Sequence, residues 1–598
     1  MHSRQARDYL RCIALSSRLA RESAGATLWI WLTAVAIQGT LPGLLVYVNK
    51  QLIDAIAAVL TGTSSSNGSR LYFWLGVEAA CMLTGFVIAR TIYSVLQPKV
   101  AAKIRIAASE LIYRGLAAVN RESLITPELQ NQRTVAIAYG VHGIADWWGT
   151  CARAVEQILS ICSVGIALAV IDYHVLLIIV IAVVPYGICE LYAARRWKRA
   201  EYDMAENARR SGYYSMVLTF DQFVSDLHLY DMYEFVIRKF REAEESMAEC
   251  SLKAGRSNFG LTIWARAIAL GGYYGAVILV ITHGGLGLAR IGSTIAYLQG
   301  AGRLQSAVEG LMARAKDIYE SLLRQLSVQI LMDQTDQKST RKQACLRRAV
   351  ESITLEDVWF QYPGSNHYVL KGVNLELRRG EMMALVGSNG AGKTTLASIL
   401  AGLLTPTAGR VRYDGMDLSE LDKRSVWRRM GFVLQDFPKY FFAVGEIIRS
   451  GPMDSLRPDE LQGVIARCKL EGLLEGLPSG LDSQLGTQFK NGTDISAGQW
   501  QKLSIARALY RNPSVLIFDE PTASLDIEAE KEVVEIVNKS RRNCLMLMIS
   551  HRLKTVQCAD KIAYLCDGRI VDIGAHEELL AKEGEYWKWM SPLQETKA

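Results

Sequence analysis

The sequence of 598 residues lacks the cysteine spacing of a disulfide framework or a zinc site. Its eleven cysteines are scattered along the chain, and none forms a C-x-x-C pair. We therefore expect reduced thiols that fill space. The chain also lacks a strong excess of one charge, because its formal net charge is only +7. This balance gives no argument for a nucleic-acid partner, and we expect none.

A chain of this length exceeds one hydrophobic core, so we expect at least two domains. Half of the residues are apolar, and the first half of the chain holds the long apolar stretches. Most of these stretches are long enough to cross a membrane as helices; they cover 25–48, 71–96, 154–170, 175–192, 259–281 and 291–312. The predicted fold is an all-α transmembrane domain of six helices, followed by an α/β P-loop domain. The predicted boundaries are 25–332 for the helices, 333–350 for a polar linker and 351–598 for the α/β domain.

The N-terminal segment, residues 1–24, has an amphipathic pattern. Arg4, Arg7, Arg11 and Arg18 fall on one face of a helix. This pattern predicts a helix that lies in the membrane interface before the first crossing. A mitochondrial transit peptide is the alternative interpretation.

Basic residues are distributed unequally between alternate loops of the predicted membrane domain. The segments 97–150 and 193–257 are rich in lysine and arginine, whereas the loop at 49–70 holds only Lys50 and Arg70. The positive-inside rule then places the N-terminus, both long segments and the C-terminal domain in the cytoplasm. We expect a multi-pass protein of a cell membrane, with a bacterial inner or plasma membrane favoured.

Residues 386–396 read VGSNGAGKTTL and fit the pattern G-x-x-x-x-G-K-[ST]. An apolar strand precedes this loop and an apolar helix follows it, which is the context of a P-loop. Its glycines allow backbone N–H groups to converge on phosphate oxygens, Lys393 adds a charge for the outer phosphates, and the Thr394 hydroxyl suits Mg²⁺. The predicted ATP-binding residues of the loop are Gly387, Ser388, Asn389, Gly390, Ala391, Gly392, Lys393, Thr394 and Thr395.

Further residues of a nucleotide site follow other predicted strands. Asp519 and Glu520 end the run VLIFDE, where Asp519 is placed to hold Mg²⁺ and Glu520 to act as the base for the attacking water. His551 follows LMLMIS and is a candidate contact to the γ-phosphate and that water. Gln435, at the end of GFVLQ, is a second candidate ligand of Mg²⁺ and a sensor of the filled site. Tyr362 offers a flat surface for adenine.

The run ISAGQWQKLSIARAL at 495–509 resembles the LSGGQ signature of ABC transporters. The resemblance covers 351–590 and implies that Ser496, Gly498 and Gln499 contact an ATP held by a second nucleotide domain. TASLD at 522–526 is similar to the D-loop of the same family. Six helices fused ahead of one nucleotide domain resemble an exporter-type half-transporter. This resemblance implies a homodimer, with a heterodimer as the alternative.

The chain departs from the family pattern at three positions. Ile495 and Ala497 replace the usual leucine and first glycine of the signature, and Lys490 stands where many exporters have an acidic residue. We expect function to survive, with a weaker or slower site. Because Glu520 and His551 are both intact, we expect two equal sites in a homodimer.

The resemblance also implies which cytoplasmic segments transmit motion between the domains. TPELQNQ at 126–132 occupies the place of the first coupling helix of exporters, and DLHLYDMYEF at 226–235 that of the second. Both correspondences are made by analogy.

Charged residues within the predicted crossings favour a polar-lined cavity and a polar cargo; they are Glu78, Glu156, Glu190, Arg266, Arg303 and Glu309. The run SAGQWQK is similar to a form found in exporters of lantibiotics and other ribosomal peptides. We predict an ATP-hydrolysing exporter that works by alternating access, with membrane lipid, cargo and a second copy as partners. Its cargo is predicted to be a peptide or amphipathic small molecule. We expect no leader-trimming activity, because no peptidase-sized segment precedes the first helix.

Three alternatives stay open at this point. The first is a lipid flippase or multidrug exporter, which the intramembrane charges disfavour. The second is an importer of exporter-like fold. The third is an ATP-gated channel that transports nothing.

Overall fold

The structure is a computed structural model of the whole chain. It describes most of the chain, namely residues 2–60, 67–118, 136–169, 181, 188–189, 192, 204, 206–284, 291–336, 344–451, 458–521, 527–541 and 544–595. The chain divides into two compact units, and the division after Thr335 falls inside the stretch predicted as a linker. The first unit comprises Met1–Ala118 with Asn131–Thr335, and the second holds Asp336–Ala598.

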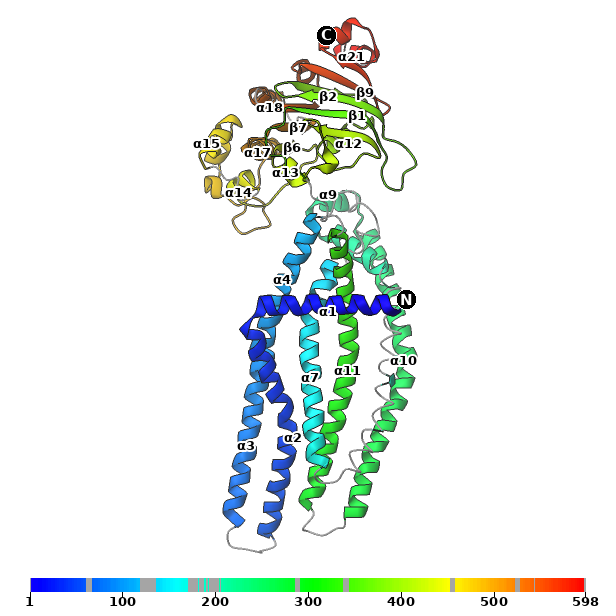
Figure 1. The fold of residues 1–598 in the computed structure, drawn as a ribbon, viewed down its shortest axis with the longest axis vertical. Helices are drawn as coiled ribbons and strands as arrows, with labels where there is room; N and C mark the ends of the chain where they lie inside the picture. The colour runs from blue at the N-terminus through cyan, green and yellow to red at the C-terminus, as the bar shows by residue number, and fades with distance from the viewer. Residues whose placement is uncertain are drawn as a thin grey trace. The chain divides into compact units, whose positions relative to one another are not determined.

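The first unit is built of helices (Figure 1). Residues 206–219 are also helical and precede α9, although they carry no label. The labelled helices are α1 (His2–Ala24), α2 (Ala26–Leu60), α3 (Asn67–Thr91), α4 (Gln97–Ala118), α7 (Val141–Ala169), α9 (Asp221–Leu229), α10 (Tyr233–Gly284) and α11 (Ile291–Asp336), with π-helical turns η1 (Ile92–Leu96) and η2 (Ala136–Gly140).

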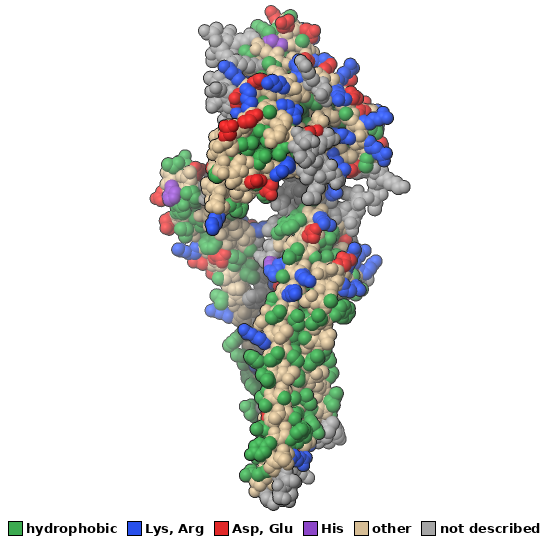
Figure 2. Space-filling model, turned by 90° about the vertical axis from the view of Figure 1, so that its left-hand side faces the viewer, with side chains coloured by type: hydrophobic (Ala, Val, Ile, Leu, Met, Phe, Trp, Pro, Cys, Tyr) green, Lys and Arg blue, Asp and Glu red, His purple; other side chains and the backbone are tan. Residues whose placement is uncertain are grey.

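Three stretches of the described residues are long and apolar enough to cross a membrane: Ala26–Leu60, Gly68–Ala117 and Val141–Ala169. A shorter apolar stretch, Ile263–Gly272, lies within α10. Large apolar side chains such as Tyr72, Phe86 and Trp264 are exposed on these helices, and Figure 2 shows hydrophobic side chains over most of the length of the helical unit. Such an exposed apolar surface is expected where lipid is the solvent.

Helices α2 and α7 pack closely because glycines remove side chains from the contact. A Cβ atom at Gly39 would lie 2.8 Å from the Glu156 carbonyl oxygen, and one at Gly43 would collide with the backbone of Ser163. Small residues four apart on one helix face allow two membrane helices to approach. The pair Gly39 and Gly43 therefore sets the distance between α2 and α7.

Helix α1 packs against α4 and α2, and it runs across the direction of the long helices of its unit (Figure 1). Cys12, Ser16 and Ala20 are buried at a spacing of four residues, as one face of a helix requires. The Trp148 indole Nε1 donates a hydrogen bond to the Ser16 carbonyl at 3.2 Å, and Arg18 is exposed. The amphipathic pattern of the sequence thus corresponds to one buried and one exposed face.

The segment 226–235 forms the junction between α9 and α10. Asp231 has a positive φ of 49° between the two helices, and the Tyr233 ring lies edge-on to His228. The other predicted coupling segment, 126–132, lies outside the described residues, as do most of 175–192, Glu190 and the D-loop at 522–526. Their predicted roles stay predictions.

The second unit contains two sheets. A four-stranded antiparallel sheet has the order β2-β1-β4-β5, and a six-stranded sheet has the order β10-β9-β3-β8-β7-β6. In the larger sheet β9, β3, β8, β7 and β6 are parallel, and β10 is antiparallel at the edge. The strands are β1 (Ser352–Phe360), β2 (Leu370–Arg378), β3 (Met382–Val386), β4 (Ala408–Tyr413), β5 (Met416–Asp417), β6 (Met430–Val433), β7 (Val515–Asp519), β8 (Leu545–Ile549), β9 (Lys561–Cys566) and β10 (Arg569–Gly574).

One face of the larger sheet packs against the smaller sheet and the helix that follows β3, and the other face packs against helices. Its central strands β3, β7 and β8 are buried along their whole length. Such continuous apolar burial is typical of parallel strands covered on both faces. The helices of this unit are α12 (Lys393–Leu400), α13 (Lys423–Trp427), α14 (Val444–Arg449), α15 (Pro458–Arg467), α16 (Glu471–Glu475), α17 (Ala497–Tyr510), α18 (Ile527–Ser540), α19 (Leu553–Gln557), α20 (His576–Ala581) and α21 (Glu585–Glu595). A helical unit followed by an α/β unit confirms the predicted fold class.

Candidate nucleotide-binding site

The P-loop connects the central strand β3 to helix α12, as the sequence predicts. Gly387 follows β3 directly, with a φ of 153°, and a Cβ atom there would collide with the Leu565 carbonyl oxygen. Gly392 caps α12 with a φ of 104°, in a region that favours glycine. The remaining loop residues, Ser388 to Ala391, lie between these two turns, so the backbone N–H groups at the start of α12 are available for an anion.

Lys393 is held inside the loop. Its ammonium Nζ donates hydrogen bonds to the carbonyl oxygens of Gly387 at 2.9 Å and Ser388 at 3.0 Å. Burial lowers the pKa of Lys393, while the nearby carboxylates of Glu520 and Asp519 act to raise it. The loop carbonyls thus keep this cation beside the place where phosphates would bind.

Asp519 ends β7 and is buried, with 1% of its surface exposed. Its carboxylate lies near the Thr394 side chain, but neither oxygen makes a hydrogen bond of standard geometry to a described residue. Burial raises the pKa of Asp519, and the charges of Glu520 and Asp436 raise it further. A buried carboxylate without a full set of donors is costly unless a cation completes it, so Asp519 and the Thr394 hydroxyl fit a divalent metal.

Glu520 is contacted by residues from both neighbouring strands. The Gln435 amide Nε2, after β6, donates to Glu520 Oε2 at 3.2 Å. His551 Nδ1, after β8, lies 3.4 Å from Glu520 Oε1. Glu520 itself has a φ of 47°, a strained conformation for a side chain of this size. The structure therefore brings Gln435, Glu520 and His551 together at the carboxyl end of the parallel strands.

Tyr362 lies beside the start of α12. Its hydroxyl shares a hydrogen bond of 3.1 Å with the hydroxyl of Thr395, and its ring packs edge-on against Phe360. The residue is 37% exposed, so part of it is accessible to a ligand.

The signature residues lie at the start of α17. Ser496 is the N-cap: its hydroxyl accepts from the Gln499 N–H at 3.3 Å, and the Gln499 side chain accepts from the Ser496 N–H at 2.9 Å. Ala497 is exposed at this helix start. Gly498 follows in the first turn. In the described part of the chain, no hydrogen bond joins Ser496, Gly498 or Gln499 to the P-loop residues.

One acidic neighbour of the site was not predicted from the sequence. Asp436 follows Gln435, and its charge acts to raise the pKa of Asp519. Its position one residue after the predicted ligand was the available signal.

The charged residues of the helical unit are partly paired. The Arg266 guanidinium lies 3.3 Å from a Glu309 carboxylate oxygen, Glu156 accepts from the Tyr93 hydroxyl at 2.6 Å, and Arg303 donates to the Pro42 carbonyl at 3.1 Å. Arg303 also lines an open cavity of about 730 Å³ with residues of α2, α3, α7 and α11. The Glu309 side chain is 16% exposed, whereas Arg266 is 56% exposed, so the contacts pair these charges without burying all of them.

Comparison with known proteins identifies the second unit. Residues 370–523 match the ABC transporter family. The chain is 32% identical over 409 residues to the subtilin transport ATP-binding protein of Bacillus subtilis, and the aligned region covers 67% of this chain and 65% of the relative. It is 28% identical over 385 residues to the nisin transport ATP-binding protein of Lactococcus lactis subsp. lactis, and the aligned region covers 64% of each of the two chains. The chain thus spans slightly less than two thirds of these relatives.

Two further similarities concern a different transporter class and the fold. A lipid A-core flippase of Alkalilimnicola ehrlichii is 38% identical over 241 residues, 40% of each chain. The structure of a bacterial Atm1-family exporter with ATP bound superposes with a TM-score of 0.79 at 20% identity, over 95% of this chain and 98% of that one. The second similarity shows that the chain shares the fold of that exporter chain over 95% of its length.

Proposed function

We propose that the chain is an ATP-hydrolysing exporter of the ABC transporter family that works by alternating access, and the match of residues 370–523 to that family supports this. The observation that carries the proposal is Glu520, which Gln435 and His551 hold beside the P-loop. A carboxylate in that place can accept the proton of an attacking water. His551 and Gln435 orient it, and His551 is 54% exposed, so its ring is accessible to a ligand.

The remaining residues bind and orient the nucleotide. Lys393 exchanges its loop carbonyls for the outer phosphates, and the loop from Gly387 to Thr395 supplies backbone N–H groups. Tyr362 stacks on the adenine. Thr394, Gln435 and Asp519 would hold Mg²⁺, which supplies charge neutralisation at the phosphates when bound. Ser496, Gly498 and Gln499 complete the site of a second copy, so the working unit is a homodimer.

We further propose a peptide cargo and a cell-membrane location, with the nucleotide domain in the cytoplasm. Two of the relatives are named for subtilin and nisin transport, and this supports a peptide. A lipid flippase is the second candidate, supported by the similarity to lipid A-core flippases over a shorter region. The polar groups around Arg303 in the open cavity favour the peptide.

The test is the ATPase rate of the purified chain in lipid vesicles, measured with peptides, lipids and drug-like cations. Stimulation by peptides alone is expected. If lipids or cations stimulate the ATPase rate instead, the peptide cargo is wrong and the chain is a lipid flippase or a multidrug exporter.

The variant Glu520→Gln serves as the internal control of the chemistry. It is expected to bind ATP normally while its turnover falls by about 10² to 10⁴, because the base is lost and the shape is kept. Wild-type turnover in this variant would remove Glu520 from its assigned role.

A further inference from the structure

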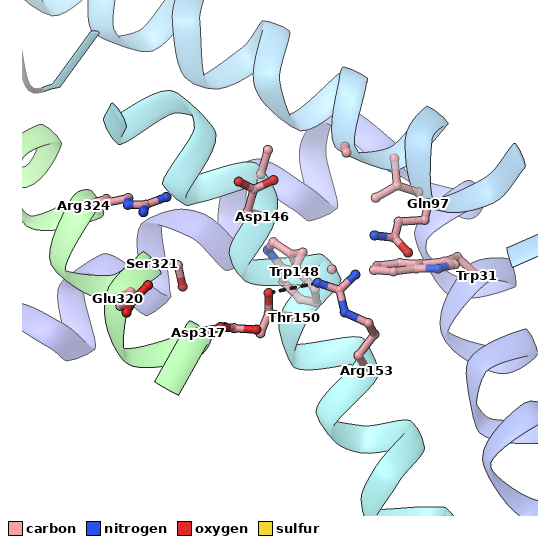
Figure 3. Close-up of a pocket in the computed structure, with 14 residues that line it drawn as sticks. Trp31, Gln97, Asp146, Trp148, Thr150, Arg153, Asp317, Glu320, Ser321 and Arg324 are labelled. Atoms are coloured by element: carbon pink, nitrogen blue, oxygen red, sulfur yellow. Dashed lines mark hydrogen bonds between the residues drawn. The ribbon is translucent and has the colours of Figure 1, made fainter. Parts of the chain in front are cut away.

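The helical unit contains a second polar cavity, separate from the open one, among α2, α4, α7 and α11 (Figure 3). Its volume is about 230 Å³. This is roughly 15 to 23 times the space that one water needs, and less than the ~300 to 1,000 Å³ of sites for drug-sized ligands. The size therefore suits a compact polar group.

One side of this cavity presents hydrogen-bond donors. Figure 3 shows the Arg153 guanidinium pointing between Trp31 and Thr150, with the Gln97 amide nearby. Arg153 donates one hydrogen bond, to the Thr150 hydroxyl at 3.3 Å, and its Nε has no partner although it is buried. The buried Trp31 Nε1 also has no partner. In the described part of the chain, no carboxylate lies within ion-pair distance of Arg153.

The other side presents acidic groups from α7 and α11. Asp146 lies opposite the Arg324 guanidinium, and Asp317 and Glu320 face the cavity from α11 (Figure 3). The Arg314 guanidinium lies 2.7 Å from a carboxylate oxygen of Asp317. The lining therefore has two cationic and three anionic side chains, Arg153 and Arg324 against Asp146, Asp317 and Glu320. Such a lining repels a simple anion from one side and a simple cation from the other, and it suits a zwitterion.

The cavity lies beside α1, the helix predicted to lie in the membrane interface. Trp148, which lines it, donates a hydrogen bond to the Ser16 carbonyl of α1. Trp31 belongs to the start of α2, directly after α1. Tryptophan is enriched at the level of lipid headgroups, and arginine binds phosphate by paired hydrogen bonds.

We propose that this cavity binds a phospholipid headgroup that carries a phosphate and a primary ammonium, as in phosphatidylethanolamine. The phosphate lies at Arg153, Trp31 and Gln97, and the ammonium donates to Asp146 and the acidic residues of α11. A headgroup with a quaternary ammonium lacks these N–H donors, and an anionic headgroup brings no cation of its own to the acidic side of the cavity. The site is distinct from the open cavity lined by Arg303, and it does not depend on what the protein transports.

The experiment is native mass spectrometry of the delipidated full chain in detergent. It is titrated with phosphatidylethanolamine, phosphatidylcholine or phosphatidylglycerol of identical acyl chains. The first phosphatidylethanolamine is expected to bind about ten-fold more tightly than the other two, the effect of one charge-assisted hydrogen bond. Equal binding of all three lipids overturns the proposal.

Variants localise the site. Arg153→Gln is expected to lose the preference, whereas Arg18→Gln keeps it, because Arg18 is exposed on α1 and pairs with Glu22 of the same helix. Trp31→Phe keeps an aromatic ring and removes one N–H donor, so we expect a partial loss of the preference for phosphatidylethanolamine. If Arg153→Gln does not fold, Trp31→Phe tests the proposal in its place. A preference that survives in the folded cavity variants contradicts the assignment.

A soluble headgroup distinguishes a lipid from a free metabolite. Glycerophosphoethanolamine is expected to displace the lipid only in large excess, because it lacks the acyl chains that the membrane helices contact. If it binds as tightly as the lipid, the ligand is a soluble phosphoethanolamine compound and the lipid assignment is wrong.

Discussion

At the scale of single residues, Asp519 is the clearest conflict between folding and function. The carboxylate is buried at the end of β7 without a full set of hydrogen bonds, and burial raises its pKa. A group whose pKa is raised on folding costs stability whenever it is ionised in the folded state. This cost is typical of a residue kept for its ligand.

We predict that Asp519→Asn raises the melting temperature of the nucleotide-free protein at pH 7. The expected gain is about 0.5 to 2 kcal/mol, or roughly 2 to 4 °C per kcal/mol. With ATP and Mg²⁺ the order of stabilities should reverse, because the variant loses a metal ligand. Asp436→Asn is the control, since Asp436 is exposed and its loss should change the melting temperature little. A variant less stable than wild type without nucleotide would contradict this account.

The same residue predicts a pH dependence. Because the pKa of Asp519 is raised above its ordinary value of about 3.9, its cost is largest above the raised pKa. It disappears below the ordinary value, where the carboxyl is protonated in both states. The difference in melting temperature between Asp519→Asn and wild type should therefore shrink as the pH falls from 7 toward 4. A difference that grows on acidification would show the opposite sign of the shift.

At the scale of elements, the packing of α2 against α7 depends on Gly43. We predict that Gly43→Ala destabilises the protein by about 1 to 3 kcal/mol, because the added methyl group meets the Ser163 backbone and forces the helices apart. Gly76→Ala is the matched control, since a Cβ there has no neighbour within 4 Å. The control should be neutral or slightly stabilising, as alanine favours a helix. Thermal unfolding in detergent measures the stability of both variants. An equal loss of stability in the two variants would contradict the packing role of Gly43.

The start of α17 carries two roles that substitution can separate. Ser496→Ala removes the cap of the helix and should cost about 0.5 to 2 kcal/mol. Ser496→Asp retains a capping side chain, so its stability should match wild type, but its charge should repel the γ-phosphate of the partner site and lower the ATPase rate. Melting temperature and turnover, measured together, test this. Full turnover in a stable Ser496→Asp variant would leave Ser496 with the capping role alone.

At the scale of the whole molecule, one chain holds the P-loop and the signature without a hydrogen bond between them among the described residues. If two copies complete each other's sites, a chain with Lys393→Ala and a chain with Gly498→Asp are each inactive alone. In a mixed pair one site carries both defects and the other carries none. Co-expression should then restore roughly a quarter of the wild-type ATPase rate, if pairs form at random and each site works independently. No recovery, with mixed pairs verified by affinity tags, would contradict the homodimer.

The sequence by itself determined the features that depend on neighbouring residues. The P-loop could be predicted because the strand, the glycine turns and the helix follow one another within a short stretch, from Met382 to Leu400. The long apolar stretches likewise predicted membrane helices, because length and composition decide whether a helix can cross lipid. The capping pair Ser496 and Gln499 is three residues apart, and it is local for the same reason.

Only the tertiary structure decided which distant residues meet. Gln435 and His551 contact Glu520 because β6 and β8 flank β7 in the sheet, an order that the sequence does not contain. The cavity of Arg153 depends on four helices whose residues, from Trp31 to Arg324, are separated along the chain by nearly the whole helical unit. In the sequence, the charged residues that line this cavity cannot be told apart from ordinary charged residues near helix ends. Only packing shows that they line one cavity, because side-chain contacts between helices follow from the angles and distances at which the helices cross.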